Sequence, residues 1–175
     1  MNSTIDFLLN AGKLKKVKRA GWVLRNVPDA ESVAEHSFRT ALICMMMGNN
    51  VNRERCIKIA LIHDLAEALV GDITPVDGVP KEEKHRREAE AFDKILKSMD
   101  INEIRTLWNE YEENKTKEAE LVHSSDKLEL ALQAYEYEKE YGSINLEEFW
   151  KSAEARIEDG KIMELFRELK GMRRG

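Results

Sequence analysis

The stretch that decides the fold is IKIALIHDLAEALVGDITP, residues 57–75. Its apolar residues recur on every side of a helix and leave only Lys58 as an ordinary surface residue, so we expect a helix buried all round. His63, Asp64 and Glu67 nevertheless stand in its middle. Moving a carboxylate from water into an apolar interior without a partner is costly. These side chains therefore need a positive charge close by.

The rest of the chain has the same helical character. Only three prolines and nine glycines interrupt its 175 residues, and no segment alternates apolar and polar residues with period two. We predict an all-α protein. The expected helices cover about 4–16, 32–48, 52–71, a segment that begins at 81, 102–112, 116–141, and one or two more from 146.

Local signals fix several helix ends. Ser32 and Glu35 have the spacing of a capping box, Asn52 can cap the helix that contains residues 57–70, and Gly71 can end it. The loop GDITPVDGVP that follows, residues 71–80, is therefore placed beside the unusual polar residues of that helix.

Composition bounds the class of protein. A hydrophobic content of 42% is enough for one domain over residues 1–175, and 33 acidic against 28 basic side chains argue against a nucleic acid polymer as partner. The N-terminus MNSTIDFLLNAGKLKK lacks a signal-peptide pattern, and no apolar run could span a bilayer. We expect a cytoplasmic protein with no membrane partner, in which Cys44 and Cys56 are buried reduced thiols.

Two further polar residues lie in apolar helical stripes. His36 shares a helix side with Thr40, and Asp126 stands four residues before Leu130 in LVHSSDKLELAL. Taken alone, each is more often a hydrogen-bonded core residue than a ligand. Together with His63 and Asp64 they form a mixed nitrogen and oxygen set suited to one divalent metal ion.

Glu67 and Asp72 are candidates for proton transfer, and each also has a structural alternative. Glu67 follows His63 by four residues, and Asp72 comes directly after the helix, so both are available for proton transfer to and from water at the metal. Their structural alternatives are an ion pair for Glu67 and a turn cap for Asp72. His85 is expected to be exposed, and His123 to be a neighbour of the site rather than a ligand.

At this point the sequence resembles the HD-domain metal-dependent phosphohydrolases. His36, the HD pair at 63 and 64, and Asp126 carry the short signature, and the segments RNVPDAESVAEHS, ALIHDLAEALVGDITP and PKEEKHRREAEA are similar to the branch of 5'-deoxynucleotidases. The resemblance covers residues 19–137. It implies an HD-domain helical bundle, a homodimer, and one divalent cation (Mn, Co, Zn, Fe, Ni or Mg) held by those four residues.

The resemblance also implies roles for other residues. Glu67 and Asp72 would be catalytic, and an arginine directly followed by a tryptophan would contact the substrate. Here the order is RAGW, so Arg19 is carried over and Trp22 is displaced from it. Lys81, which begins the helix after residues 71–80, is a further candidate for binding phosphate.

The predicted function is hydrolysis of (deoxy)nucleoside 5'-monophosphates to nucleoside and inorganic phosphate. One alternative is an HD-fold hydrolase of a nucleoside triphosphate or a cyclic dinucleotide, although a longer phosphate chain would need more basic residues. Another is a helical dimer that binds nucleotide without catalysis. Methionines 45–47 fit a dimer contact.

Overall fold

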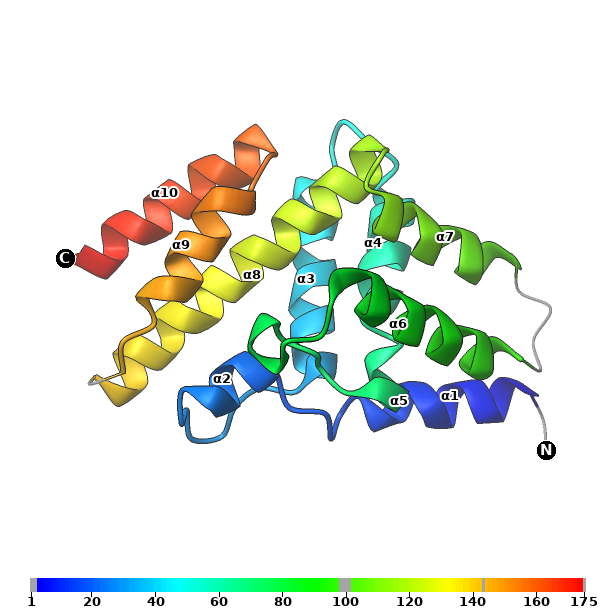
Figure 1. Cartoon of the computed structure of the whole chain (residues 1–175). Coiled ribbons are helices and arrows are strands. Elements are labelled where there is room, and N and C mark those ends of the chain that lie inside the picture. The colour runs from blue at the N-terminus through cyan, green and yellow to red at the C-terminus, as the bar shows by residue number, and fades with distance from the viewer. Residues whose placement is uncertain (1–2, 98–101, 143, 175) are drawn as a thin grey trace. The chain divides into compact units, whose positions relative to one another are not determined.

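The computed structural model describes residues 3–97, 102–142 and 144–174, and Figure 1 shows that the named elements in those ranges are helices. The all-α prediction is confirmed. The elements are α1 (Ser3–Lys13), α2 (Ala20–Leu24), α3 (Val33–Met47), α4 (Arg53–Ile62), α5 (Glu67–Val70), the 3-10 helix η1 (Pro75–Asp77), α6 (Lys81–Leu96), α7 (Asn102–Glu113), α8 (Lys117–Tyr141), α9 (Glu147–Arg156) and α10 (Gly160–Arg174). No helix among the described residues has the length and apolar character needed to cross a membrane.

The predicted helix caps are present. At the start of α3 the backbone N–H of Ser32 donates to Oε2 of Glu35 at 2.6 Å, and the backbone N–H of Glu35 donates to the Ser32 hydroxyl at 3.3 Å. At the start of α4 the side-chain oxygen of Asn52 accepts from the backbone N–H of Arg55 at 3.1 Å. These bonds satisfy N–H groups that have no partner within the helix itself.

The prediction of one continuous helix over residues 52–71 is wrong. α4 ends at Ile62 and α5 begins at Glu67, with a turn between them. In this turn the backbone N–H of Leu65 donates to the carbonyl of Ile62 at 3.0 Å, and that of Glu67 donates to Asp64 at 3.0 Å. This three-residue spacing is tighter than that of an α-helix. His63 and Asp64 therefore lie in the turn rather than within a helix.

The apolar residues around this turn are also less uniformly buried than predicted. Ile59 and Ala60 are fully buried, whereas Leu61 is 52% and Leu69 is 40% exposed. Gly71 ends α5 as expected, with a φ of +77° that favours glycine.

One helix, α2, lies between the predicted helices over residues 4–16 and 32–48, where no helix was expected. α2 begins where the backbone N–H of Trp22 donates to the carbonyl of Arg19 at 3.1 Å. The two ends of the segment that contains α2 are joined. The backbone N–H of Arg19 donates to the carbonyl of Glu31 at 3.0 Å, and Lys18 and Ser32 form an antiparallel bridge next to this bond. This closure fixes Arg19 at the base of a short loop.

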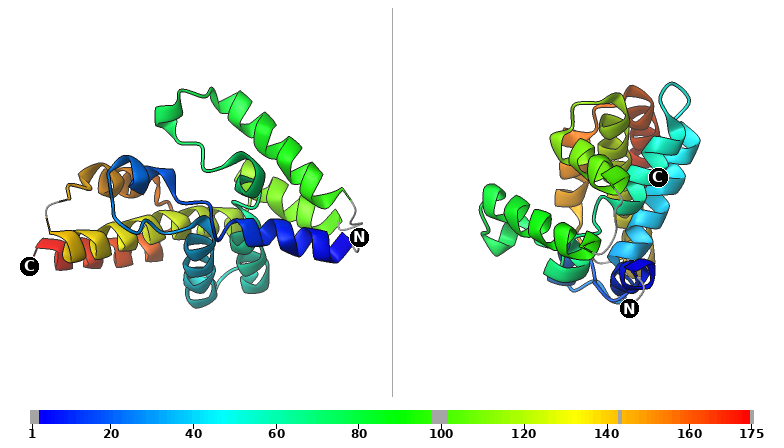
Figure 2. Two further views of the ribbon diagram at one scale, coloured as in Figure 1. Left: turned by 90° about the horizontal axis from the view of Figure 1, so that it is seen from below. Right: turned by 90° about the vertical axis from the view of Figure 1, so that its right-hand side faces the viewer.

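The first of two compact units consists of Met1–Glu35 and Ile62–Thr106. Within it α1, α5 and α6 pack against one another (Figures 1 and 2). The unit also contains α2 and η1, so the turn with His63 and Asp64 and the loop over residues 71–80 belong to it.

The second unit consists of His36–Leu61 and Leu107–Gly175. Its longest helix, α8, packs along α9 and α10 (Figure 1). The rings of Trp150 on α9 and Phe166 on α10 lie 5.9 Å apart, and the guanidinium of Arg173 lies over Trp150 at 4.6 Å. These contacts join α9 to α10, and both of these helices pack against α8, which carries Asp126.

The two cysteines are buried free thiols, as predicted. Burial is the main cause that raises the pKa of Cys44 to about 11 and the pKa of Cys56 to about 12. Both thiols are therefore uncharged at neutral pH and contribute apolar packing.

Candidate functional site

The second unit contributes an imidazole and a carboxylate from two different helices. Nε2 of His36 on α3 lies 3.2 Å from Oδ1 of Asp126 on α8. His36 is fully buried and Asp126 is 5% exposed. The other oxygen of Asp126 accepts a hydrogen bond from the ammonium of Lys127 at 2.7 Å, and Nδ1 of His36 is hydrogen-bonded to the buried carboxylate of Glu129.

The first unit contributes a matching pair from the turn between α4 and α5. Nε2 of His63 lies 3.2 Å from Oδ2 of Asp64. Nη1 of Arg19 lies 3.5 Å from the same carboxylate oxygen. The turn therefore places an imidazole, a carboxylate and a guanidinium together.

Both pairs have the spacing that metal ligands require. Bonds from zinc to imidazole nitrogen and carboxylate oxygen are about 2.0–2.2 Å long, so two ligands at the tetrahedral angle stand about 3.3 Å apart. The separation in each pair is 3.2 Å. Imidazole nitrogen and carboxylate oxygen are also donors that divalent cations accept. Each pair fits two positions of a cation's coordination shell.

Glu67 is the buried acid of the first unit. Its side chain begins α5, the residue is 4% exposed, and Oε2 accepts no hydrogen bond from the residues that the structure describes. Burial, followed by the negative charges of Asp64 and Asp72, raises the pKa of Glu67 well above its ordinary value of 4.5. A carboxylate with a raised pKa is a stronger proton acceptor than an ordinary one.

This pKa shift predicts how Glu67→Gln changes the stability of the metal-free protein. The folded protein keeps a proton on Glu67 that the unfolded chain releases above about pH 4.5, so folding stability falls as the pH rises toward the folded pKa. Each pH unit in this window costs about 1.4 kcal/mol. Glutamine has no such proton. The variant should match the wild type below pH 4.5 and exceed it increasingly above that pH.

Urea unfolding of the chelator-treated wild type and Glu67→Gln across this pH range measures the difference. Glu83→Gln is the control, because neighbouring Arg86 and Arg87 lower the pKa of Glu83 to about 2 and its effect should have the opposite sign. Parallel stability profiles for wild type and Glu67→Gln would contradict the raised pKa.

Asp72 connects two segments of the first unit. Its Oδ2 accepts a hydrogen bond from the backbone N–H of Ala20 at 2.8 Å. Ala20 directly follows Arg19, so this bond fixes the beginning of the loop after α5 against the start of α2. Asp72 thus has a structural role, which it fills with one of its two carboxylate oxygens.

Lys84 supplies a positive charge that the sequence did not reveal. Its ammonium donates to the carbonyl of Ile73 at 2.9 Å and so anchors the same loop. Burial alone would lower the pKa of Lys84, but the negative charges of Glu88, Glu67, Asp64 and Asp72 outweigh burial and raise it. Lys84 therefore stays charged beside the carboxylates of the first unit.

The structure gives two predicted substrate-binding residues, Trp22 and Lys81, other surroundings than expected. Trp22 is 1% exposed, and its indole N–H donates to Oε1 of Glu31 at 2.9 Å, so its ring packs inside the protein rather than facing solvent. Lys81 is exposed at the start of α6, and the charge interactions with the site carboxylates belong to Lys84, three residues later. Lys84 is the better candidate for a phosphate contact.

The sequence contained one signal that was overlooked. Glu129 stands between Leu128 and Leu130 and is fully buried, the same anomaly that singled out Asp126. His85 is exposed, as expected, and His123 contacts Tyr111. The ring of His123 stacks on Tyr111 at 4.0 Å, and its Nε2 is 2.9 Å from the Tyr111 carbonyl.

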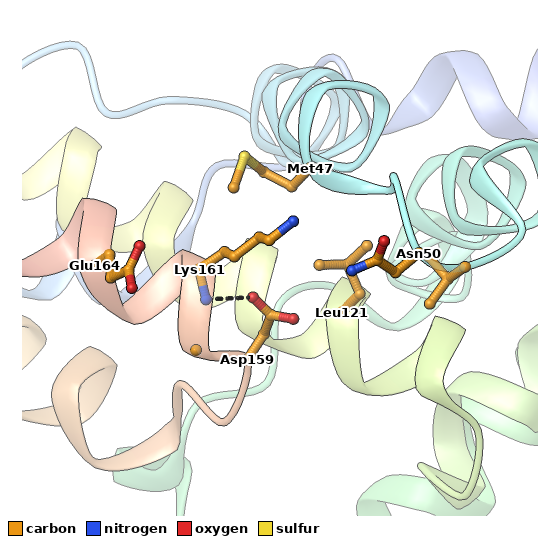
Figure 3. A pocket seen from close by; sticks show the side chains of 8 residues that line it. Met47, Asn50, Leu121, Asp159, Lys161 and Glu164 are labelled. Atoms are coloured by element: carbon orange, nitrogen blue, oxygen red, sulfur yellow. Dashed lines mark hydrogen bonds between the residues drawn. The ribbon is translucent and has the colours of Figure 1, made fainter.

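A pocket in the second unit contains none of the predicted site residues. Figure 3 shows it between the end of α3 and the start of α10, lined by Met47, Asn50, Val51, Leu121, Asp159, Gly160, Lys161 and Glu164. Oδ1 of Asp159 accepts from the backbone N–H groups of Lys161 and Ile162, both at 2.9 Å. The start of α10 is therefore already capped, and the pocket is not a candidate active site.

Comparison with known proteins assigns the chain to a family. The HD domain model matches residues 11–166. The chain belongs to the HD domain family. The 5'-deoxynucleotidase HDDC2 of Homo sapiens is 43% identical over 176 residues, which cover 98% of this chain and 86% of that protein. The protein of the same name from Danio rerio is 42% identical over 174 residues, covering 97% of this chain and 87% of its own length.

A solved structure has a closely similar fold. A conserved hypothetical protein from Pyrococcus furiosus has a TM-score of 0.80 at 36% identity, covering 95% of this chain and 98% of its own. The predicted family and the helical HD fold are confirmed.

Proposed function

We propose that this HD domain protein is a metal-dependent 5'-deoxynucleotidase that removes phosphate from (deoxy)nucleoside 5'-monophosphates. The observation that carries the proposal is the pair of imidazole–carboxylate contacts at 3.2 Å, each at ligand spacing, with the buried Glu67 next to one of them. The names of the relatives from Homo sapiens and Danio rerio support the same activity.

We propose further that His36, His63, Asp64 and Asp126 hold one divalent cation. Two imidazoles and two carboxylates are a balanced shell for Mn, Co, Zn, Fe, Ni or Mg, and they leave positions for water and substrate. When bound, the cation would act as a Lewis acid toward a phosphate oxygen and lower the pKa of water, which makes hydroxide accessible at neutral pH.

The residues of the first unit would bind the phosphate and move the protons. Arg19 presents a forked guanidinium that suits a phosphate group, and Lys84 adds a second positive charge. Glu67 would take the proton of the attacking water, since its raised pKa makes it a stronger proton acceptor than an ordinary carboxylate. As the bond between phosphorus and the ribose oxygen breaks, Asp72 would give a proton to that oxygen.

Substrate selection tests the activity. Phosphate release from deoxyribo- and ribonucleoside 5'-monophosphates, a nucleoside triphosphate and a cyclic dinucleotide should be measured with the same metal-loaded protein. We expect release from the monophosphates alone. Hydrolysis confined to the triphosphate or the cyclic dinucleotide would favour a different HD hydrolase, and nucleotide binding without hydrolysis would indicate a non-catalytic dimer.

Asp72→Asn separates the leaving-group proton from the rest of the reaction. The variant should lose on the order of 100-fold in turnover of a nucleotide, the usual scale for a positioned acid. Its loss should be smaller for p-nitrophenyl phosphate, whose leaving group needs no proton. Asparagine can still accept the hydrogen bond from Ala20, so the loop is expected to keep its place. Equal losses for both substrates would assign Asp72 a purely structural role.

We propose that the protein forms a homodimer through the outer face of α3. Phe38, Leu42, Met45 and Met46 lie on one side of this helix and are 62%, 38%, 46% and 70% exposed. A self-complementary apolar face is typical of a two-fold dimer. Sedimentation should show dimers at micromolar concentration and monomers for Met46→Glu, whereas Met172→Glu, at an exposed methionine of α10, should stay dimeric. A monomeric wild type would contradict the proposal.

A further inference from the structure

Glu129 connects His36 to the rest of the second unit through a buried contact. It lies on α8, three residues after Asp126, and is fully buried. Its Oε2 is hydrogen-bonded to Nδ1 of His36, the ring nitrogen that faces away from Asp126. The two carboxylates therefore contact the two different nitrogens of one imidazole.

Arg39 holds the other oxygen of Glu129. Its Nε and Nη2 lie 3.0 Å and 2.8 Å from Oε1. The same guanidinium donates from Nη1 to both oxygens of Glu136 at 2.7 Å and from Nη2 to the side-chain oxygen of Gln133 at 2.6 Å. Glu129, Gln133 and Glu136 lie on one side of α8. These bonds hold the guanidinium of Arg39 against this side of α8, and Arg39 in turn holds the carboxylate of Glu129 in place.

This arrangement decides which nitrogen of His36 can bind a cation. A neutral imidazole carries one N–H and one lone pair, and a carboxylate can only accept a hydrogen bond. Glu129, which accepts from Nδ1, therefore keeps the proton of His36 on Nδ1 and leaves the lone pair on Nε2. Nε2 is the nitrogen that stands 3.2 Å from Asp126. The hydrogen bond at Nδ1 also orients the ring, so that Nε2 points toward Asp126.

We propose that Glu129 is a positioning residue that holds His36 in the tautomer and orientation required of a metal ligand, and that Arg39 anchors Glu129 in this role. The inference rests on the proposed function, since it needs His36 to bind the cation. Neither residue is assigned a contact with the substrate. Their effect should therefore appear in the affinity for metal, before any nucleotide is added.

Titration of Co²⁺ into the metal-stripped full chain tests this role by calorimetry and by the visible absorption of the bound ion. Glu129→Gln keeps the shape of the side chain, but its amide can donate as well as accept and no longer selects one tautomer. We expect its dissociation constant for Co²⁺ to rise by about 10–100-fold, with an altered cobalt spectrum. Arg39→Gln should weaken binding in the same direction by a smaller factor.

Glu110→Gln is the matched control. Glu110 is a largely buried glutamate of the same unit that pairs with an arginine, Arg55, and has no contact with His36. Its Co²⁺ affinity should stay within about twofold of the wild type, as expected of a residue outside the metal site. Circular dichroism of each metal-free variant checks folding.

The possible outcomes separate the two proposals. If the wild type binds Co²⁺ and Glu129→Gln binds it equally well, the positioning role is overturned and the metal site stands. If the wild type binds no Co²⁺, the proposed metal site fails and the positioning role fails with it. If Glu129→Gln does not fold, Arg39→Gln decides, and an unchanged affinity in that variant overturns the inference.

Discussion

Asp64→Ala should lose its metal and its turnover together. Asp64 would supply one carboxylate ligand, and its Oδ2 lies 3.2 Å from Nε2 of His63, so the substitution removes half of the donor pair in the first unit. A bound cation contributes several kcal/mol of transition-state stabilisation, so turnover should fall on the order of 1,000-fold. The measurements are metal content per chain after purification and phosphate release from a deoxynucleoside 5'-monophosphate.

Asp93→Ala is the control for this substitution. Asp93 is an exposed carboxylate of α6 that pairs with Arg105, and it has no role in the proposed mechanism. It should retain metal and activity. If Asp64→Ala keeps a full complement of metal and normal turnover, Asp64 is not a ligand.

Glu67→Ala should fail in a different way. It should keep its metal and still bind nucleotide, yet lose on the order of 100-fold in turnover, because it removes a positioned base and no ligand. The raised pKa of Glu67, caused by burial and by the charges of Asp64 and Asp72, is what suits it to this role. Metal content, nucleotide affinity and turnover of the same preparation separate the two kinds of residue.

The half-buried Glu83 on α6 offers a control of the same residue type. It pairs with Arg86 and Arg87, so Glu83→Ala should leave all three measurements unchanged. Normal turnover in Glu67→Ala would make this carboxylate a structural neighbour, and the proton transfer assigned to it would have to be abandoned.

The sequence was sufficient to predict the fold class, the family and several of the buried polar residues. The fold class follows from helical periodicity and from the small number of proline and glycine residues, which are properties of the chain as a whole. The burial of His36, His63 and Asp126 followed from their place in apolar stripes, since a polar residue there is unusual whatever its role. The metal-binding and catalytic roles, the single domain over residues 1–175 and the cytoplasmic location stay predictions.

Other features depend on contacts that periodicity does not encode. The break after Ile62 arises from backbone hydrogen bonds at three-residue spacing, in a stretch whose side chains alone favour an unbroken helix. The charged block over residues 81–90 is typical of a solvated helix face, so the sequence could not tell that Lys84, and not Lys81, meets the site carboxylates. Trp22 is held by Glu31, a partner nine residues away across a loop.

Metal-dependent hydrolysis of a deoxynucleoside 5'-monophosphate is the most direct test of the proposed function. The metal-stripped protein should be titrated with Co²⁺ or Mn²⁺ while phosphate release is followed at saturating substrate. Release should be negligible without metal and should rise to a plateau at one cation per chain, because His36, His63, Asp64 and Asp126 are proposed to share one ion. Phosphate release that is unaffected by chelation, or a complete absence of release with every cation, would contradict the proposed function.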